Sequence, residues 1–180
     1  MEIVKTKIPD LYIIKPRVFE DNRGYFFESY NKNAFLQNGI DQNFVQDNES
    51  KSSKGVLRGL HFQKTPFAQG KLVRVMQGAV LDVAVDLRKA STTYGEWVAV
   101  ELNHDNKWMY WIPPGFAHGF VTLEDSTVFF YKCTNVYNKE SEGSILWNDP
   151  DLNIDWKISN PILSEKDLHS PLFKDFISPF

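Results

Sequence analysis

Residues 79–88 read AVLDVAVDLR and show the cleanest alternation in the chain. The odd-numbered positions from Ala79 to Leu87 are all apolar, whereas Asp82 and Asp86 lie at positions between them. A period of two is typical of a β-strand with one face in a core and the other toward solvent. We therefore expect a half-buried strand here, with both aspartates on its polar face.

Similar short apolar stretches recur on both sides of this strand, separated by turn-forming residues. They are QNFVQDNE (42–49), GVLRGLHFQ (55–63), KLVRVMQ (71–77), EWVAVEL (96–102), KWMYWIP (107–113), HGFVTL (118–123), TVFFYKCT (127–134) and SILWN (144–148). Strands in this number and spacing predict an all-β protein, most naturally a jelly-roll β-barrel. Short helices are expected near the two ends, over residues 31–39, ended by Gly39, and after Ser164 as N-cap. No linker or repeat interrupts residues 1–180, which predicts a single domain.

Composition excludes several classes of protein. The 180 residues are 42% hydrophobic and 24% charged, which is ordinary for a soluble domain with its own core. The net charge of -3 gives no support to a nucleic-acid partner, and no apolar run is long enough for a membrane helix. The N-terminus lacks the layout of a signal peptide, and the single cysteine, Cys133, suits a reducing compartment. These features predict a cytoplasmic protein in which Cys133 is a buried, inert thiol.

A metal site has no sequence signature in this chain. Metal sites of small β-barrels usually take two histidines one residue apart on a strand and then a glutamate. His61 is followed by FQKTPFAQGK, and His118 stands alone in PPGFAHGF. The sequence therefore predicts no metal ligands.

General acid–base chemistry is the better supported alternative. His61 in GLHFQ (59–63) has a side chain suited to proton transfer near neutral pH, although a histidine in such a strand, taken singly, is more often a hydrogen-bonded structural residue. Lys71 alternates with Val73 on the next predicted strand, so its charge would point toward apolar surroundings and need an anion. Tyr131 alternates with Phe129 and could point its hydroxyl into the same barrel. Together a base, a cation and a phenol would form a proton-abstraction site.

Seven ordered blocks of the sequence resemble one known family. They are RGYFFESY (23–30), FVQDNES (44–50), GVLRGLHFQ (55–63), QGKLVRVMQGAVLDVAVDLRKAS (69–91), WIPPGFAHGF (111–120), YKCTNVY (131–137) and LSEKD (163–167). The chain is similar, from about residue 3 to residue 172, to the dTDP-4-dehydrorhamnose 3,5-epimerases, which are cupin-like enzymes of dTDP-L-rhamnose biosynthesis. One departure is Phe62, which replaces a commoner tyrosine.

The resemblance implies a homodimer with exchanged N-terminal segments that inverts C3 and C5 of a dTDP-4-keto-6-deoxy sugar without metal or cofactor. It implies that His61 is the base, Tyr131 the proton donor on the opposite face, and Lys71 the group that stabilises the enolate oxygen. Asp167 would pair with His61. Substrate contacts would come from Arg23, Glu28, Gln46, Asp47, Asn48, Arg58, Lys71, His118, Glu142 and Lys166.

Several alternatives stay open at this point. Asp167 fits a capping box that begins at Ser164, which would make it a helix-start residue instead of a catalytic partner. Arg58 should point away from His61 because their separation is odd, unless a bulge at Gly59 resets the alternation or Arg58 serves a neighbouring subunit. Related activities on this fold are epimerisation at one carbon and ketoisomerisation. A barrel that binds sugar nucleotides without catalysis is the alternative outside enzymes.

Overall fold

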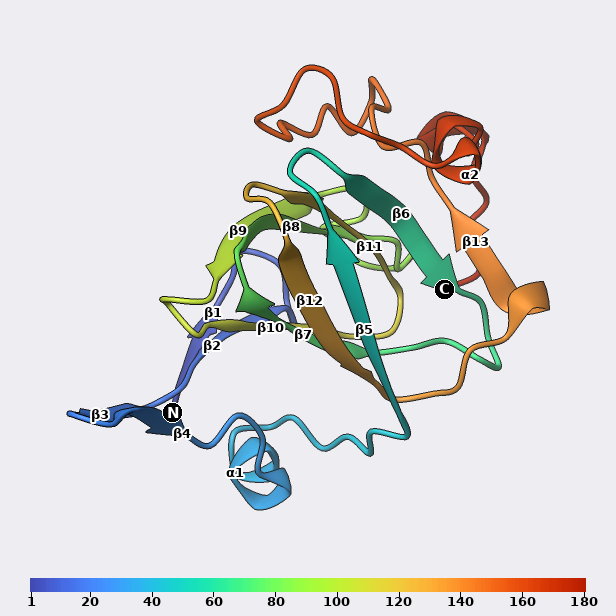
Figure 1. Ribbon diagram of the computed structural model, residues 1–180. Helices are drawn as coiled ribbons and strands as arrows, with labels where there is room; N and C mark the ends of the chain where they lie inside the picture. The colour runs from blue at the N-terminus through green and yellow to red at the C-terminus, as the bar shows by residue number, and fades with distance from the viewer.

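The computed structural model describes residues 1–180 as two antiparallel sheets packed face to face, with a separate hairpin (Figure 1). The six-stranded sheet has the order β1 (Glu2–Lys5), β2 (Tyr12–Lys15), β10 (Met109–Ile112), β7 (Lys71–Gln77), β12 (Thr127–Cys133) and β5 (Gln46–Ser52). The five-stranded sheet has the order β13 (Glu142–Ser144), β6 (Leu57–Gln63), β11 (Phe116–Thr122), β8 (Ala79–Asp86) and β9 (Trp97–Asn103). The predicted all-β class is confirmed, and the two sheets are consistent with a jelly roll.

The main core fills the space between the sheets. Val73 and Val75 of β7 meet Val80 and Ala84 of β8 there, together with Phe129 of β12. The inner faces of the two sheets therefore enclose one apolar interior, which also determines which side chains can line a cavity. No helix of the chain combines the length and the apolar character needed to cross a membrane.

Strand β8 corrects the expectation of a half-buried strand. Asp82 and Asp86 are 0% exposed, and both faces of the strand are covered. Its even-numbered positions face the other sheet, whereas Val83 and Val85 pack under Leu152 and other residues of the C-terminal segment. The prediction of a solvated polar face was wrong because the even-numbered positions face the six-stranded sheet, while a segment more than 60 residues further along the chain covers the odd-numbered apolar face.

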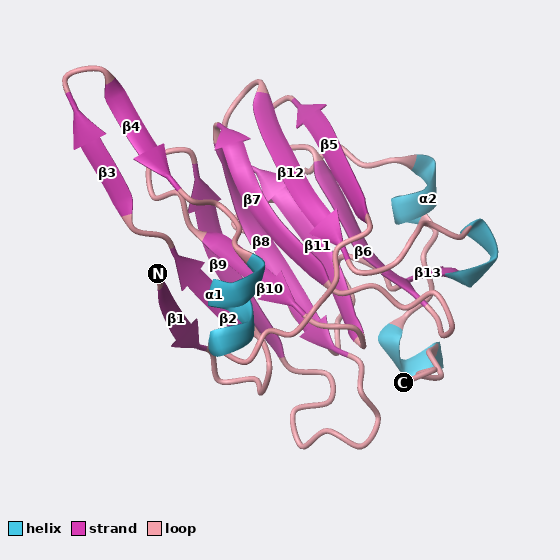
Figure 2. Cartoon of the chain, turned by 90° about the horizontal axis from the view of Figure 1, so that it is seen from below, coloured by secondary structure: helices cyan, strands magenta, loops and turns pink.

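The N-terminal region contains four strands that the sequence patterns did not single out. Besides β1 and β2, a hairpin of β3 (Val18–Asp21) and β4 (Gly24–Phe27) projects from the body of the molecule (Figures 1 and 2). The first predicted strand covers 42–49, whereas the observed strand, β5, begins at Gln46 and ends at Ser52. Phe44 packs edge-on against Tyr30 and Trp111 instead of joining a sheet.

Both predicted helices are present and short. Helix α1 (Lys32–Gln37) begins after Asn31, whose side chain accepts hydrogen bonds from two backbone N–H groups, and it lies against the outer face of the six-stranded sheet (Figure 2). Helix α2 (Glu165–Leu168) begins after Ser164, as predicted, and lies beside β6 (Figure 1). Two 3-10 turns cover Lys139–Ser141 and Phe173–Asp175. The C-terminal segment thus brings α2 to the edge of the interior.

Candidate active site

A cavity of about 400 Å³ opens between the two sheets and is closed on one side by residues 162–167. Strands from both sheets contribute to its wall. Its polar side chains are Ser50, Arg58, His61, Lys71, His118, Tyr131, Ser164 and Asp167. Six of the residues predicted from the sequence therefore line one cavity, and the size is suitable for a small ligand.

A bulge in β6 explains how Arg58 and His61 reach the same cavity. In the pairing with β11, His118 lies opposite His61, whereas Phe120 lies opposite Arg58, so three steps on β6 match two on β11. The register shift includes Gly59, which has a φ of +134° and leaves no room for a Cβ against the backbone of Gly119. Of the alternatives for Arg58, the structure supports the bulge.

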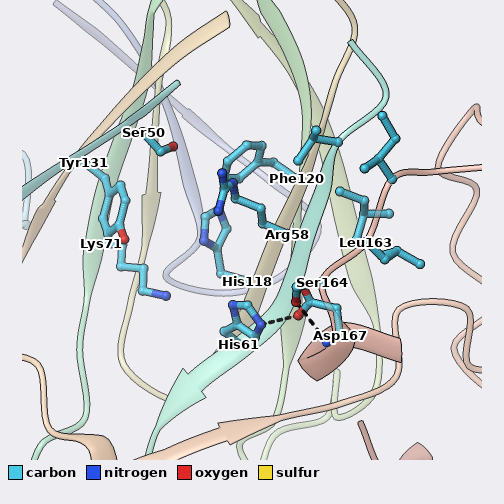
Figure 3. A pocket seen from close by; sticks show the side chains of 13 residues that line it. Ser50, Arg58, His61, Lys71, His118, Phe120, Tyr131, Leu163, Ser164 and Asp167 are labelled. Carbon is cyan, nitrogen blue, oxygen red and sulfur yellow. Dashed lines mark hydrogen bonds and ion pairs between the residues drawn. The ribbon is translucent and has the colours of Figure 1, made fainter. Parts of the chain in front are cut away.

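His61 and Asp167 form a hydrogen-bonded pair at the wall of the cavity (Figure 3). The distance from Nε2 of His61 to Oδ1 of Asp167 is 2.5 Å, and the side chains are 30% and 3% exposed. The hydroxyl of Ser164 donates to Oδ2 of the same carboxylate at 2.8 Å and also accepts from its backbone N–H. Asp167 is thus both the cap-box residue of α2 and the partner of His61, because the two contacts use different oxygens.

Asp167 is held in its ionised form by these contacts. Burial by itself would raise the pKa of Asp167, but the hydrogen bonds from His61 and Ser164 outweigh it and lower the pKa below its usual range. A carboxylate at Nε2 fixes a neutral imidazole as the Nε2–H tautomer, so that Nδ1 carries the lone pair. His61 consequently has the arrangement of an oriented base.

Lys71 and Tyr131 lie on the opposite side of the cavity from His61 and Asp167 (Figure 3). Burial lowers the pKa of Lys71, and the negative charges of Asp82 and Glu142 oppose this effect and favour the ammonium. Burial raises the pKa of Tyr131, so its phenol keeps its proton. A base therefore faces a lysine and a phenolic proton donor across one space.

His118 belongs to β11 and lies beside His61. Its Nε2 lies 3.0 Å from both carboxylate oxygens of Asp82, and the side chains are 7% and 0% exposed. His118 is therefore both hydrogen-bonded within the protein and part of the cavity wall. Sequence reasoning missed Asp82, although an aspartate between Val80 and Ala84 on one strand face was the available signal.

Arg58 lies in the cavity wall, whereas four further predicted contacts on β5, β13 and α2 lie outside its lining. Arg58 donates to the hydroxyl of Ser52 at 3.2 Å, which braces it between the sheets. Glu142, on the strand next to β6, forms an ion pair with Lys166. Gln46 donates to Asn48 at 3.1 Å on the strand next to Tyr131.

Another three predicted contacts also lie outside the cavity lining of the single chain. Asp47 sits on the outer face of β5 and pairs with Lys132 at 2.8 Å. Arg23 pairs with Asp21 within the projecting hairpin and its side chain is 85% exposed. Glu28, just after that hairpin, accepts a hydrogen bond from an exposed asparagine.

Two further predictions concern the absence of metal chemistry and the cysteine. No three His, Cys, Asp or Glu side chains of the chain gather into a group able to hold a metal ion. Cys133 is fully buried, as predicted, and the amide of Asn48 lies 3.6 Å from its sulfur. Phe62 packs edge-on against Phe176 and Phe180 outside the cavity, so this departure from the family pattern is a matter of packing.

The chain is similar to known proteins over nearly its whole length. The family model described as dTDP-4-dehydrorhamnose 3,5-epimerase matches residues 5–175. The enzyme of that name from Salmonella typhimurium is 58% identical over 174 residues, which cover 96% of this chain and 95% of the relative. The crystal structure of dTDP-4-dehydrorhamnose 3,5-epimerase from Elizabethkingia anophelis is 58% identical, with a TM-score of 0.94 and 97% of each chain covered. A Legionella pneumophila dTDP-6-deoxy-D-glucose-3,5-epimerase, solved in complex with dTDP-4-keto-L-rhamnose, is 49% identical, with a TM-score of 0.92 over 96% of this chain and 93% of that one.

Proposed function

The chain belongs to the dTDP-4-dehydrorhamnose 3,5-epimerase family, and from this premise we propose that it converts dTDP-4-dehydro-6-deoxy-D-glucose into dTDP-4-dehydro-L-rhamnose. The reaction inverts C3 and C5 of the sugar, the two carbons that flank the C4 ketone. One observation carries the proposal for the mechanism. A single cavity contains the oriented pair of His61 and Asp167 on one side and Lys71 with Tyr131 on the other.

His61 acts as the base in each inversion. Its Nδ1 takes the proton from C3 or C5, and the electron pair of the broken C–H bond forms an enolate with the ketone. The carboxylate of Asp167 stabilises the imidazolium that results, in the manner of other His–Asp pairs. No cofactor is needed because the ketone of the substrate is the electron sink.

Lys71 and Tyr131 complete the reaction from the other side. The ammonium of Lys71 stabilises the negative charge on the enolate oxygen, which is usually the largest single contribution to such chemistry. Tyr131 donates its phenolic proton to the face opposite His61, which inverts the carbon. Each inversion leaves His61 protonated and Tyr131 deprotonated, and exchange with solvent restores both groups.

The dianionic diphosphate is bound by the cations around the cavity. Arg58 is held by Ser52 in the wall, and guanidinium groups are suited to bidentate phosphate binding. Lys166, paired with Glu142, supplies a second cation beside β6.

We further propose a homodimer in which the hairpin of one protomer reaches the cavity of its partner. The hairpin projects from the body, and Phe19, Tyr25 and Phe26 on it are 50%, 56% and 71% exposed. Apolar exposure of this kind is typical of an interaction surface. Exchange of the hairpin would bring Arg23 to the nucleotide of the neighbouring protomer.

The experiment that tests the function is incubation of the 4-keto-6-deoxyglucose nucleotide with the protein in heavy water, followed by proton NMR. Deuterium at both C3 and C5 is expected. Deuterium at one carbon would indicate a single-site epimerase, a moved ketone would indicate a ketoisomerase, and binding without exchange would indicate a binding protein. His61→Asn should abolish exchange at both carbons while binding of dTDP persists.

A further inference from the structure

Asp82 is a fully buried carboxylate next to the cavity. It lies on the inner face of β8 and is 0% exposed. Removing a carboxylate from water is costly unless it is paired, and a neutral side chain would fill this position more cheaply. Its one hydrogen-bond partner is the ring of His118, and its charge also acts on the amino group of Lys71.

The geometry of the pair selects one tautomer of His118. Nε2 lies 3.0 Å from each oxygen of Asp82, which is the position of one N–H donor shared by both oxygens of a carboxylate. Burial raises the pKa of Asp82, and His118 and Lys71 oppose this rise and favour the ionised form. A neutral imidazole has one N–H donor and one lone-pair acceptor. Both hydrogen bonds of the ring involve Nε2, so Nδ1 is left as the acceptor on a residue that lines the cavity.

The surroundings favour the neutral ring in a fixed orientation. Burial lowers the pKa of His118, the positive charges of Lys71 and His61 act in the same direction, and Asp82 offsets them only in part. The ring of Phe129 stacks on the imidazole, with centroids 6.1 Å apart and an interplanar angle of 21°. His118 is therefore held both by a hydrogen bond and by packing.

His118 Nδ1 is a hydrogen-bond acceptor in a cavity wall that contains several donors. Lys71, Arg58 and the protonated Tyr131 all present N–H or O–H donors to the cavity. Donors suit the ketone oxygen and the phosphates of the proposed substrate. Its remaining ring groups that can donate are the hydroxyls at C2 and C3, because C4 carries the ketone and C6 is a methyl group.

We infer that Asp82 holds His118 as the Nε2–H tautomer so that Nδ1 accepts a hydrogen bond from a ring hydroxyl of the bound sugar. This inference rests on the proposed function for the identity of the ligand. Asp82 is then a positioning residue and the pair is a specificity determinant. A site built to accept a hydroxyl proton disfavours an analogue that cannot donate, because the buried acceptor stays unpaired.

Two measurements test the inference without turnover. Nitrogen-15 NMR of the free protein should show His118 as the neutral Nε2–H tautomer at pH 7. Calorimetry should show that dTDP-glucose binds about tenfold or more tightly than its 2-fluoro or its 3-fluoro analogue, because fluorine matches the size of a hydroxyl but donates no hydrogen bond. In Asp82→Asn the amide can donate to Nε2 and move the ring proton to Nδ1. The fluorine penalty, meaning the ratio of the affinity for dTDP-glucose to that for a fluoro analogue, should then be no more than about threefold.

Asp105→Asn is the matched control, because it breaks an exposed pair with His104 outside the cavity, and it should keep the full fluorine penalty. If Asp82→Asn fails to fold, His118→Phe takes its place and should also lose the penalty, because phenylalanine has no acceptor. A proton on Nδ1 in the unaltered protein, or equal binding of all three nucleotides, overturns the inference. A chain that passes both tests but exchanges no hydrogen in heavy water would lose the proposed function and keep the inference.

Discussion

Replacing Asp167 by asparagine removes the negative charge beside His61 while keeping the size of the side chain. The carboxylate lies 2.5 Å from Nε2 of His61 and is almost completely buried, so water cannot replace it. In the proposed mechanism His61 becomes positively charged as the proton leaves carbon. The substitution therefore acts on the transition state more than on the resting protein.

The size of the effect follows from the charge separation. The N–O distance of 2.5 Å places the centres of the two charges roughly 4 Å apart, where two unit charges interact by about 4 kcal/mol at an effective dielectric constant of about 20. Each 1.36 kcal/mol is about a factor of ten in rate, so Asp167→Asn should lower the exchange rate about 10³-fold. Rotation of the amide that places its NH₂ toward Nε2 would favour the wrong tautomer and increase the loss.

The assay is deuterium incorporation at C3 and C5 under kcat/KM conditions, with dTDP affinity and thermal unfolding measured in parallel. Folding should change little, by about 1 kcal/mol or 2–4 °C, because Ser164 still caps α2 through the backbone N–H. Asp155→Asn, at an exposed ion pair with Lys157, is the matched control and should exchange normally. Exchange by Asp167→Asn within tenfold of the unaltered chain would refute the role assigned to the pair.

Other predictions follow from the same geometry. Tyr131→Phe should allow deuterium to enter from the His61 side without inversion, and epimer accumulating at the normal rate in NMR spectra would contradict the assignment of the donor. Gly59→Ala should cost about 2–5 kcal/mol in chemical unfolding, because the new Cβ would lie 2.4 Å from the Cα of Gly119, whereas Gly24→Ala, with a φ of +123° and open space around it, should cost about 1–2 kcal/mol. Although burial opposes it, hydrogen bonding lowers the pKa of Asp167, so its contribution to stability is present above the unfolded value of about 3.9 and lost as pH falls through the folded value. The Tm difference between the unaltered chain and Asp167→Asn should then shrink in acid, below about pH 4. Dialysis against a chelator should leave exchange unchanged, and a loss restored by zinc or iron would point to a metal instead.

Period-two patterning located most of the strands that build the cavity. The alternation of Lys71 with Val73, and of Tyr131 with Phe129, placed both functional side chains on the inner face, where the structure has them. That prediction worked because the inner face of an antiparallel sheet is one continuous surface, so a polar residue in register with core residues must enter the interior. The N-terminal strands were missed because they are only four residues long and lie next to charged positions.

Pairings between distant residues could not come from patterning. His61 and Asp167 are 106 positions apart and meet because α2 folds back onto β6. Only the resemblance to a family suggested this contact, since the local sequence described no more than a helix cap. The orientation of Arg58 was likewise undecided, because a bulge adds one residue to one strand and leaves no fixed mark in the sequence beyond a glycine.

The two carboxylates that hold histidines were both assigned a local role first, for the same physical reason. Asp167 satisfies the capping pattern of α2 through one oxygen and still has the other free for His61. Asp82 occupies a polar position in an alternating strand, and the alternation is the same whether the polar face meets water or a polar cavity. A polar face toward water and one toward a cavity differ in whether the apolar face of the strand is covered from outside by another segment. Once residues from the C-terminal segment bury Val83 and Val85, the even-numbered positions can only face the interior, and an acid there requires a partner. Asp86, at another even-numbered position of the strand, has Arg88, Ser91 and Thr93 as its partners away from the cavity, so a buried aspartate indicates a site only where its partner lines one.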